Sequence, residues 1–277
     1  MRPLGVLKMD TASIYSQWRE INSEFLGQLR GKQIFLLFSG GKDSSVGMDL
    51  IMRARSEYDF SLQAHGGAYP VHRYTKSDLQ RIRAYWEAKG AQIVWHKIDQ
   101  TDTQLNSAED PCKVCQRLRK EKLNKVLKSE IRDWTKLVLV VCYSLSDLAS
   151  YAVEHILGAF SGQKDLSPEG SERAMETAQR FYPFLVMKEG YVVFRPLLTL
   201  DSRTIYEYLD QMGIPTLSIP CRYRNFRPKR LLEEYYKKMA LRFDYEQVFD
   251  FMKQIKDFPL GDTFTSMDKE KYLSKIF

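Results

Sequence analysis

A short glycine-rich segment, SGGKDS at residues 39–44, has the composition of a phosphate-binding loop. It lies between an apolar run at 33–38 and a stretch with helical spacing. Adjacent glycines let the backbone turn tightly and bring its N–H groups close to a ligand. Ser44 and Ser45 stand at the predicted helix start, where unpaired N–H groups favour an anion, and Lys42 adds positive charge. The segment is shorter than a Walker-A loop, so it predicts a phosphate site of another kind.

Three of the four cysteines have a spacing that suits a metal centre. Cys112 and Cys115 form a CxxC pair where a loop is predicted to enter a helix, and Cys221 lies on a distant loop. The pair alone also fits a redox pair, half of a zinc site or two buried thiols. Three thiolates with one open position suit a [4Fe–4S] cluster, and the residues alone leave these alternatives open.

Positive charge is concentrated in two blocks of the sequence. The chain has a net charge of +7, and residues 113–132 and 222–242 each hold eight Lys/Arg and two Glu, so the remainder is mildly acidic. Such blocks form solvated helix faces or bind a polyanion, because Lys/Arg clusters bind phosphates with release of counterions. Each block begins beside a candidate ligand, at Cys112 and at Cys221, and this favours the polyanion.

Strands and helices alternate along most of the chain, and they must position both motifs. Apolar runs predict strands at 33–38, 60–67, 91–99, 137–144 and 191–198. Spacings of three and four predict helices at 11–30, 46–55, 77–90, 114–131, 147–160 and 202–213, and residues 162–172 are predicted to be a loop. The alternation predicts an α/β fold with a doubly wound, mostly parallel, Rossmann-like sheet of five strands.

The elements divide the chain into three regions. Residues 1–30 are expected to form an N-terminal helix, and residues 31–200 a core with the glycine-rich loop and the CxxC pair. Residues 201–277 lack strand signals beyond about 222 and predict a helical C-terminal appendage that holds the third cysteine.

The composition excludes several classes of protein. With 44% hydrophobic and 28% charged residues, the chain can form a large core and is unlike a disordered protein. The longest uncharged apolar stretch, 137–146, has about half of the ~20 residues of a membrane span. No sustained apolar region follows Arg2, and four cysteines are too few for a disulfide scaffold. We therefore expect a cytoplasmic protein without membrane contact.

The loop SGGKDS makes the chain resemble the PP-loop ATP pyrophosphatase superfamily, whose SGGxDS loop grips the pyrophosphate of ATP. The resemblance implies adenylation of a carbonyl oxygen, release of pyrophosphate, and displacement of AMP by a nucleophile. It implies Mg²⁺ bridging the phosphates, His65 near the nucleotide, and ATP contacts from Ser39, Gly40, Gly41, Lys42, Asp43 and Ser44. Arg195, in an Arg-Pro-Leu motif of the family, either reaches the phosphates or braces the strand end.

The segment PCKVCQRLRKEKL, with the later RPLLTL, GIP and IPC, is similar to the tRNA 2-thiolation branch of this superfamily. That branch includes the tRNA 2-thiocytidine and 2-thiouridine synthetases, in which three cysteines bind a [4Fe–4S] cluster. Carried over, the ligands are Cys112, Cys115 and Cys221, with Zn²⁺ as the alternative metal. The resemblance implies an ATP-dependent sulfurtransferase that thiolates a nucleobase carbonyl of tRNA or another RNA. It leaves the sulfur donor unidentified and is compatible with a homodimer.

Tyrosine and phenylalanine side chains interleave with Arg and Lys in the second basic block. Aromatic residues in such surroundings either stack on unpaired bases or pack against neighbouring helices. The candidates are Tyr223, Phe226, Tyr235 and Tyr236.

Residues 142–148, CYSLSDL, depart from the family pattern GHNLDDE. Asp147 matches the second aspartate and is a candidate catalytic or Mg²⁺-associated carboxylate, or else a helix N-cap. Cys142 is either a buried structural thiol or a persulfide carrier. The departure keeps two alternatives open: a PP-loop enzyme that thiolates or amidates a free small molecule such as a purine, and a zinc-containing adenylating enzyme without sulfur chemistry.

Overall fold

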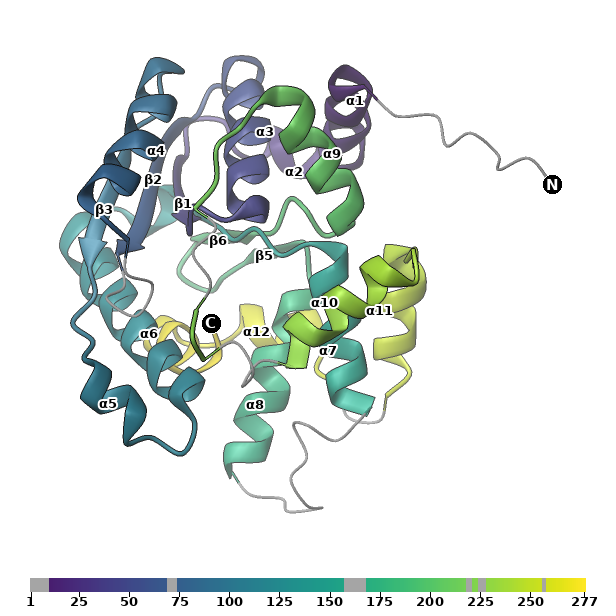
Figure 1. Ribbon diagram of the computed structural model, residues 1–277. Helices are drawn as coiled ribbons and strands as arrows, with labels where there is room; N and C mark the ends of the chain where they lie inside the picture. The colour runs from purple at the N-terminus through teal and green to yellow at the C-terminus, as the bar shows by residue number, and fades with distance from the viewer. Residues whose placement is uncertain (1–9, 69–73, 157–167, 218–220, 224–227, 256–257) are drawn as a thin grey trace.

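The computed structural model describes residues 10–68, 74–156, 168–217, 221–223, 228–255 and 258–277. Within them, six strands form one sheet in the order β3-β2-β1-β4-β6-β5 (Figure 1). All neighbours are parallel except β5 and β6. The strands are β1 Gln33–Phe38, β2 Ser61–Ala68, β3 Ile93–Lys97, β4 Leu137–Val140, β5 Phe184–Val186 and β6 Val192–Phe194. The mostly parallel α/β fold is confirmed, and β5 is an antiparallel edge strand that the apolar pattern does not predict.

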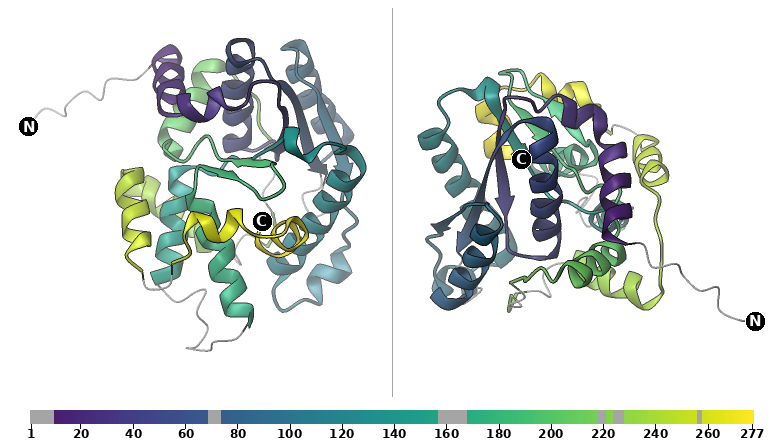
Figure 2. Two further views of the ribbon diagram at one scale, coloured as in Figure 1. Left: turned by 180° about the vertical axis from the view of Figure 1, so that it is seen from behind. Right: turned by 90° about the horizontal axis from the view of Figure 1, so that it is seen from above.

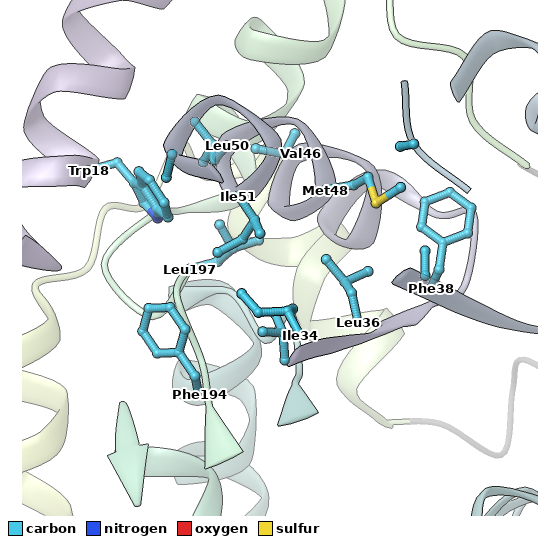
Figure 3. Packing of buried hydrophobic residues seen from close by; sticks show 14 of the residues in the cluster. Trp18, Ile34, Leu36, Phe38, Val46, Met48, Leu50, Ile51, Phe194 and Leu197 are labelled. Carbon is cyan, nitrogen blue, oxygen red and sulfur yellow. The ribbon is translucent and has the colours of Figure 1, made fainter. Parts of the chain in front are cut away.

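Helices cover both faces of the sheet (Figure 2). Side chains alternate between the faces along β1: Ile34, Leu36 and Phe38 contribute to one apolar cluster, and Phe35 to another. The first cluster is covered by α1 Thr11–Ile21, α2 Ser23–Gly27, α3 Lys42–Tyr58, α4 Lys76–Ala88 and α9 Ser202–Met212. Figure 3 shows how Trp18 of α1 and Val46 of α3 pack in this cluster.

The opposite face is covered partly by the end of the chain. Here Phe35 packs with residues of α6 Pro111–Glu130, α8 Pro168–Ala178, α12 Gly261–Thr265 and the terminal turn Tyr272–Ile276. The C-terminal segment is helical, as predicted, and it completes the core instead of lying apart from it. Helices α10 Pro228–Lys238 and α11 Tyr245–Lys253 pack on α7 Leu145–Ile156, and the short helices are α5 Asp102–Asn106 and α13 Lys269–Lys271.

Local signals explain where several helices begin. Thr75 and Asp78 form a capping box at α4, and Asp110 caps α6, where Pro111 is the first helical residue. The helix predicted at 11–30 is interrupted at Asn22, and α8 begins inside the predicted loop 162–172. Among the described residues, no helix combines the length and the apolar character that a membrane crossing requires.

Candidate active site

The glycine-rich loop lies where the sheet changes direction. Strands β1 and β4 are neighbours, and the chain continues from β1 to β2 on one side and from β4 toward β6 on the other. Such a switch point leaves a crevice outside the carboxyl ends of the strands, where ligands bind in α/β proteins. Residues 39–41 follow β1 at this crevice, and Asp147, in the first turn of α7, follows β4.

Gly40 is required by both its conformation and its surroundings. Its φ of +73° lies in the left-handed region, and a Cβ atom there would lie 2.6 Å from the Leu217 side chain. The Leu217 N–H also donates a 2.7 Å hydrogen bond to the Gly40 carbonyl. The loop is therefore joined to the segment that precedes Cys221.

Serine hydroxyl groups shape the rest of the loop. The N–H of Ser39 donates to Ser44 Oγ at 3.2 Å, and the N–H of Gly41 donates to Ser39 Oγ at 3.2 Å. Gly41 is the N-cap of α3 and provides no side-chain cap. The first N–H groups of an α-helix have no intrahelical partner, so the start of α3 suits a phosphate group.

Two lysines and three carboxylates meet at this loop. Lys42 Nζ lies 2.7 Å from Asp43 Oδ1 and 3.4 Å from Glu233 Oε1 of α10. Lys229, also from α10, forms an ion pair with the buried Asp147. The other oxygen of Asp147, Oδ2, accepts a 3.0 Å hydrogen bond from the Ser144 N–H. Helix α10 thus brings a cation and an anion to the crevice.

Burial and neighbouring charges lower the pKa of Asp147 and raise the pKa of Asp43, Lys42 and Lys229. Burial tends to raise the pKa of Asp147, but Lys229 and Lys42 outweigh it and hold that pKa below the ordinary 3.8. Burial, together with the charge of Asp147, raises the pKa of Asp43. Burial tends to lower the pKa of Lys229 and of Lys42, but the adjacent carboxylates raise both. Both lysines are therefore held in the cationic form.

Two candidate metal ligands lie in the first turns of α6, and the third packs against one of them. Cys112 and Cys115 are buried in the first turns of that helix, and Cys221 packs with Cys115 and Leu105 in a small apolar cluster. The Cys112 Sγ lies 3.8 Å from the carbonyl oxygen of Tyr223. A helix N-terminus stabilises thiolates, so the location suits metal ligands.

The segment that carries Cys221 is held against α5. Arg222 donates to Asn106 Oδ1 at 2.6 Å, and the Tyr223 hydroxyl donates to the same oxygen at 2.5 Å. Arg222 also lies 3.5 Å from Asp102 Oδ1. These contacts hold the third cysteine beside Cys115, although the sequence separates the two widely.

The structure does not bring Arg195 to the phosphate loop. Its buried guanidinium donates to the Tyr182 carbonyl at 2.8 Å and contacts Gln179 and Tyr272, which favours the bracing role. Cys142 lies beside α3, where a Cβ at Gly47 would collide with its sulfur. Burial and the nearby Asp43 raise the pKa of this thiol, which favours packing over nucleophilic chemistry.

His65 is also engaged away from the loop. Its ring stacks on Phe35 with centroids 3.5 Å apart, and its nitrogens contact His96 and Gln63. Burial and the neighbouring His96 lower the pKa of His65 to about 3. These contacts leave the ring little access to a nucleotide. The candidate stacking residue Phe226 lies outside the described residues.

The basic blocks are partly exposed and partly paired. In α6, Lys113 and Arg117 are exposed near the cysteines, although Arg117 lies 3.8 Å from Glu121, and Lys128 lies 2.8 Å from Glu270. Of the candidate stacking residues in α10, Tyr235 is 53% exposed and Tyr236 is buried.

Sequence reasoning missed the roles of Lys229, Glu233 and Leu217. Lys229 lies inside the second basic block, but its partner Asp147 is distant in the sequence. No local pattern reveals such a pair. The sequence shows only that Lys229 lies near the start of the helix after Cys221; it does not indicate the partner of that lysine.

Comparison with solved structures identifies the fold. The U34-tRNA thiolase NcsA from Methanococcus maripaludis, solved with its [4Fe–4S] cluster, matches with 15% identity over 94% of this chain and 89% of that chain, at a TM-score of 0.62. The NMN synthetase from Francisella tularensis matches with 12% identity, coverages of 94% and 92% and a TM-score of 0.42. No family model matches the sequence, and no curated protein matches it. The chain thus shares its fold with the U34-tRNA thiolase structure, in agreement with the α/β fold that the sequence predicts.

Proposed function

We propose that this chain is an ATP-dependent sulfurtransferase that adenylates a nucleobase carbonyl, in tRNA, and replaces its oxygen with sulfur. The observation that carries the proposal is the hydrogen bond between Leu217 and Gly40. It joins a loop built for phosphate to the segment of the third cysteine. A phosphate site and a cysteine-bound metal centre joined in this way would suit a reaction that uses both.

The loop and its lysines would bind the phosphates of ATP. The N–H groups at the start of α3 face the crevice, and Lys42 and Lys229 can exchange their carboxylate partners for phosphate oxygens. Asp147 and Asp43, released from the lysines, offer the hard oxygen ligands that Mg²⁺ prefers. The same cations would stabilise the charge that develops when the carbonyl oxygen attacks the α-phosphate and pyrophosphate leaves.

Cys112, Cys115 and Cys221 would hold a [4Fe–4S] cluster. Their donor chemistry fits, because Cys115 and Cys221 share one apolar cluster and Cys112 lies three residues before Cys115 in the first turn of α6. When bound, the centre would supply an iron with an open position for sulfur. The surrounding residues would exclude water and hold the base, a sulfur nucleophile would attack the activated carbon, and AMP would leave.

Metal analysis of anaerobically purified protein tests the cysteine assignment. The wild-type chain is expected to be brown and to contain iron and sulfide, and Cys221→Ala to lose the colour and the activity together. Cys142→Ala is the matched control and should keep the iron. A colourless wild-type chain with zinc and no iron would refute the cluster, and active C221A would refute the role of Cys221.

A second candidate is thiolation of a free base or another small molecule. It is favoured by ion pairs that neutralise part of the basic blocks, such as Lys128 with Glu270. Nucleoside mass spectrometry of tRNA from cells that lack the protein separates the candidates. A missing thiolated nucleoside supports the RNA substrate, and an unchanged profile with turnover of a free base supports the small molecule.

A further inference from the structure

A cluster of two histidines and a glutamate lies under α6, apart from the cysteines. His65 of β2 pairs in register with Val94, and Gly67 pairs with His96 of β3, so the two imidazoles share one face of the sheet. Glu130, the last residue of α6, reaches this face. The ligand atoms of these three side chains all lie within 4.8 Å of one another. Among the described residues, no other group of three or more His, Cys, Asp or Glu side chains meets this criterion for a metal site.

We propose that His65, His96 and Glu130 form a binding site for a divalent transition-metal ion such as Zn²⁺. His65 Nδ1 lies 3.0 Å from His96 Nε2 and 3.7 Å from Glu130 Oε2. A tetrahedral Zn²⁺ ion with bonds of about 2.0–2.1 Å separates its ligand atoms by about 3.3 Å. The three atoms therefore need to move little to surround one ion.

The surroundings of His65 resemble those of a metal-bound imidazole. Its second nitrogen, Nε2, lies 3.1 Å from the side-chain oxygen of Gln63, which can only accept a hydrogen bond. Nε2 therefore carries the proton, and the lone pair of Nδ1 faces the other two ligands. Such an outer hydrogen bond is what orients histidine ligands in metal sites. Stacking on Phe35, with 6° between the ring planes, holds the ring in this orientation.

A metal ion at this site would take the place of the proton that lies between His96 Nε2 and His65 Nδ1. Because the contact with Gln63 assigns the proton of His65 to Nε2, its Nδ1 is the acceptor in the metal-free arrangement and His96 Nε2 is the donor. Coordination requires His96 to carry its proton on Nδ1 instead, so that both facing nitrogens present lone pairs. Three protein ligands leave one tetrahedral position, which water can reach because the Glu130 side chain is 37% exposed.

Such an ion would connect the end of α6 to two strands. The other end of α6 carries Cys112 and Cys115, so the ion would restrain the helix that presents them. The expected role is structural, because the site lies apart from the crevice.

Titration with Zn²⁺ and Co²⁺ tests the site in the full chain with Cys112, Cys115 and Cys221 replaced by Ser. We expect one equivalent to bind, with visible Co²⁺ bands typical of nitrogen and oxygen ligands and a higher melting temperature. Glu130→Gln and His96→Asn should lower the affinity at least about tenfold, and Gln63→Ala by about 10–100-fold. His155→Asn, at the end of α7, is the matched control and should bind as the parent does.

Two outcomes overturn the proposal: binding of no ion by the parent, or equal affinity in the parent, E130Q and H96N. The partly exposed Glu130 keeps the test valid if H96N unfolds, because its replacement opens no core cavity. In the chain with its cysteines intact, E130Q should lower the zinc content by one per molecule and leave the iron content unchanged.

Discussion

The candidate active site depends on individual charges that compensate one another. Asp147 is almost fully buried, and a buried carboxylate remains ionised only if a cation accompanies it. Lys229 supplies that cation from a helix that the sequence places far away. The glycine-rich loop could be predicted from the sequence, because its residues are consecutive. The pair with Lys229 could not, because only tertiary packing creates it.

Lys229→Met should destabilise the chain by about 3 kcal/mol at pH 7, because breaking a buried ion pair leaves an uncompensated charge. The free energy of unfolding in urea measures this, with the exposed Lys238→Met on the same helix as control. Adding Asp147→Asn to K229M should recover part of the loss. Equal stability of K229M and K238M would contradict the pairing.

The pH dependence of stability should follow from the low pKa of Asp147. A group whose pKa is lower in the folded than in the unfolded state adds stability that is present above the unfolded pKa and is lost as the pH falls through the folded pKa. The wild-type contribution is therefore complete above about pH 4 and is lost in stronger acid. In K229M, Lys42 and the Ser144 N–H alone oppose burial, so the pKa of Asp147 should rise toward or above its unfolded value and the loss of stability in acid, measured by urea unfolding as a function of pH, should be smaller than in the wild type.

Gly40→Ala should cost about 2–4 kcal/mol, because a left-handed φ costs an alanine about 1–2 kcal/mol and the contact with Leu217 adds strain. Thermal or urea unfolding measures the effect. Gly27→Ala is the control, since a Cβ there meets nothing within 4 Å. Adding Leu217→Ala should relieve the steric part only, and a G40A protein as stable as G27A would disprove the requirement.

At the level of elements, long apolar runs were predictable and short elements were not. Strands β1 and β4 have continuous apolar sequences; β1 appears where expected, and β4 begins where expected but ends at Val140. Strand β5 has three residues, too few to show a period, and it is fixed by pairing with β6. Helix α8 begins with PEG, a sequence typical of a loop, and its later residue Ala178 packs under the sheet. Tertiary contacts determine both elements.

On the scale of the whole molecule, the two ends of the chain close opposite faces of one sheet. Helix α1 covers the face of α3, and the terminal turn Tyr272–Ile276 covers the face of α6. The sequence predicted the helical character of residues beyond 201 but not that they complete the core. The exposed basic residues of α6 lie beside the cysteines, where an RNA backbone would pass in the proposed reaction.

Replacing Lys113 and Arg117 by Ala should weaken tRNA binding and lower the slope of its salt dependence by about two, because each removes one phosphate contact. Affinity for ATP should not change. Arg81→Ala with Lys188→Ala removes the same charge outside both blocks and is the matched control. If both double variants bind tRNA equally, α6 does not contact RNA.

The hydrogen bond between Leu217 and Gly40 has a thermodynamic consequence. A ligand that shifts the loop must also shift the backbone four residues before Cys221. Linkage makes such coupling reciprocal: whatever factor nucleotide binding applies to metal affinity, the metal applies to nucleotide affinity. For an enzyme that binds both ligands as proposed, the order of binding then changes the pathway but not the final free energy, and a molecule with one ligand holds it with a different affinity than a molecule with both.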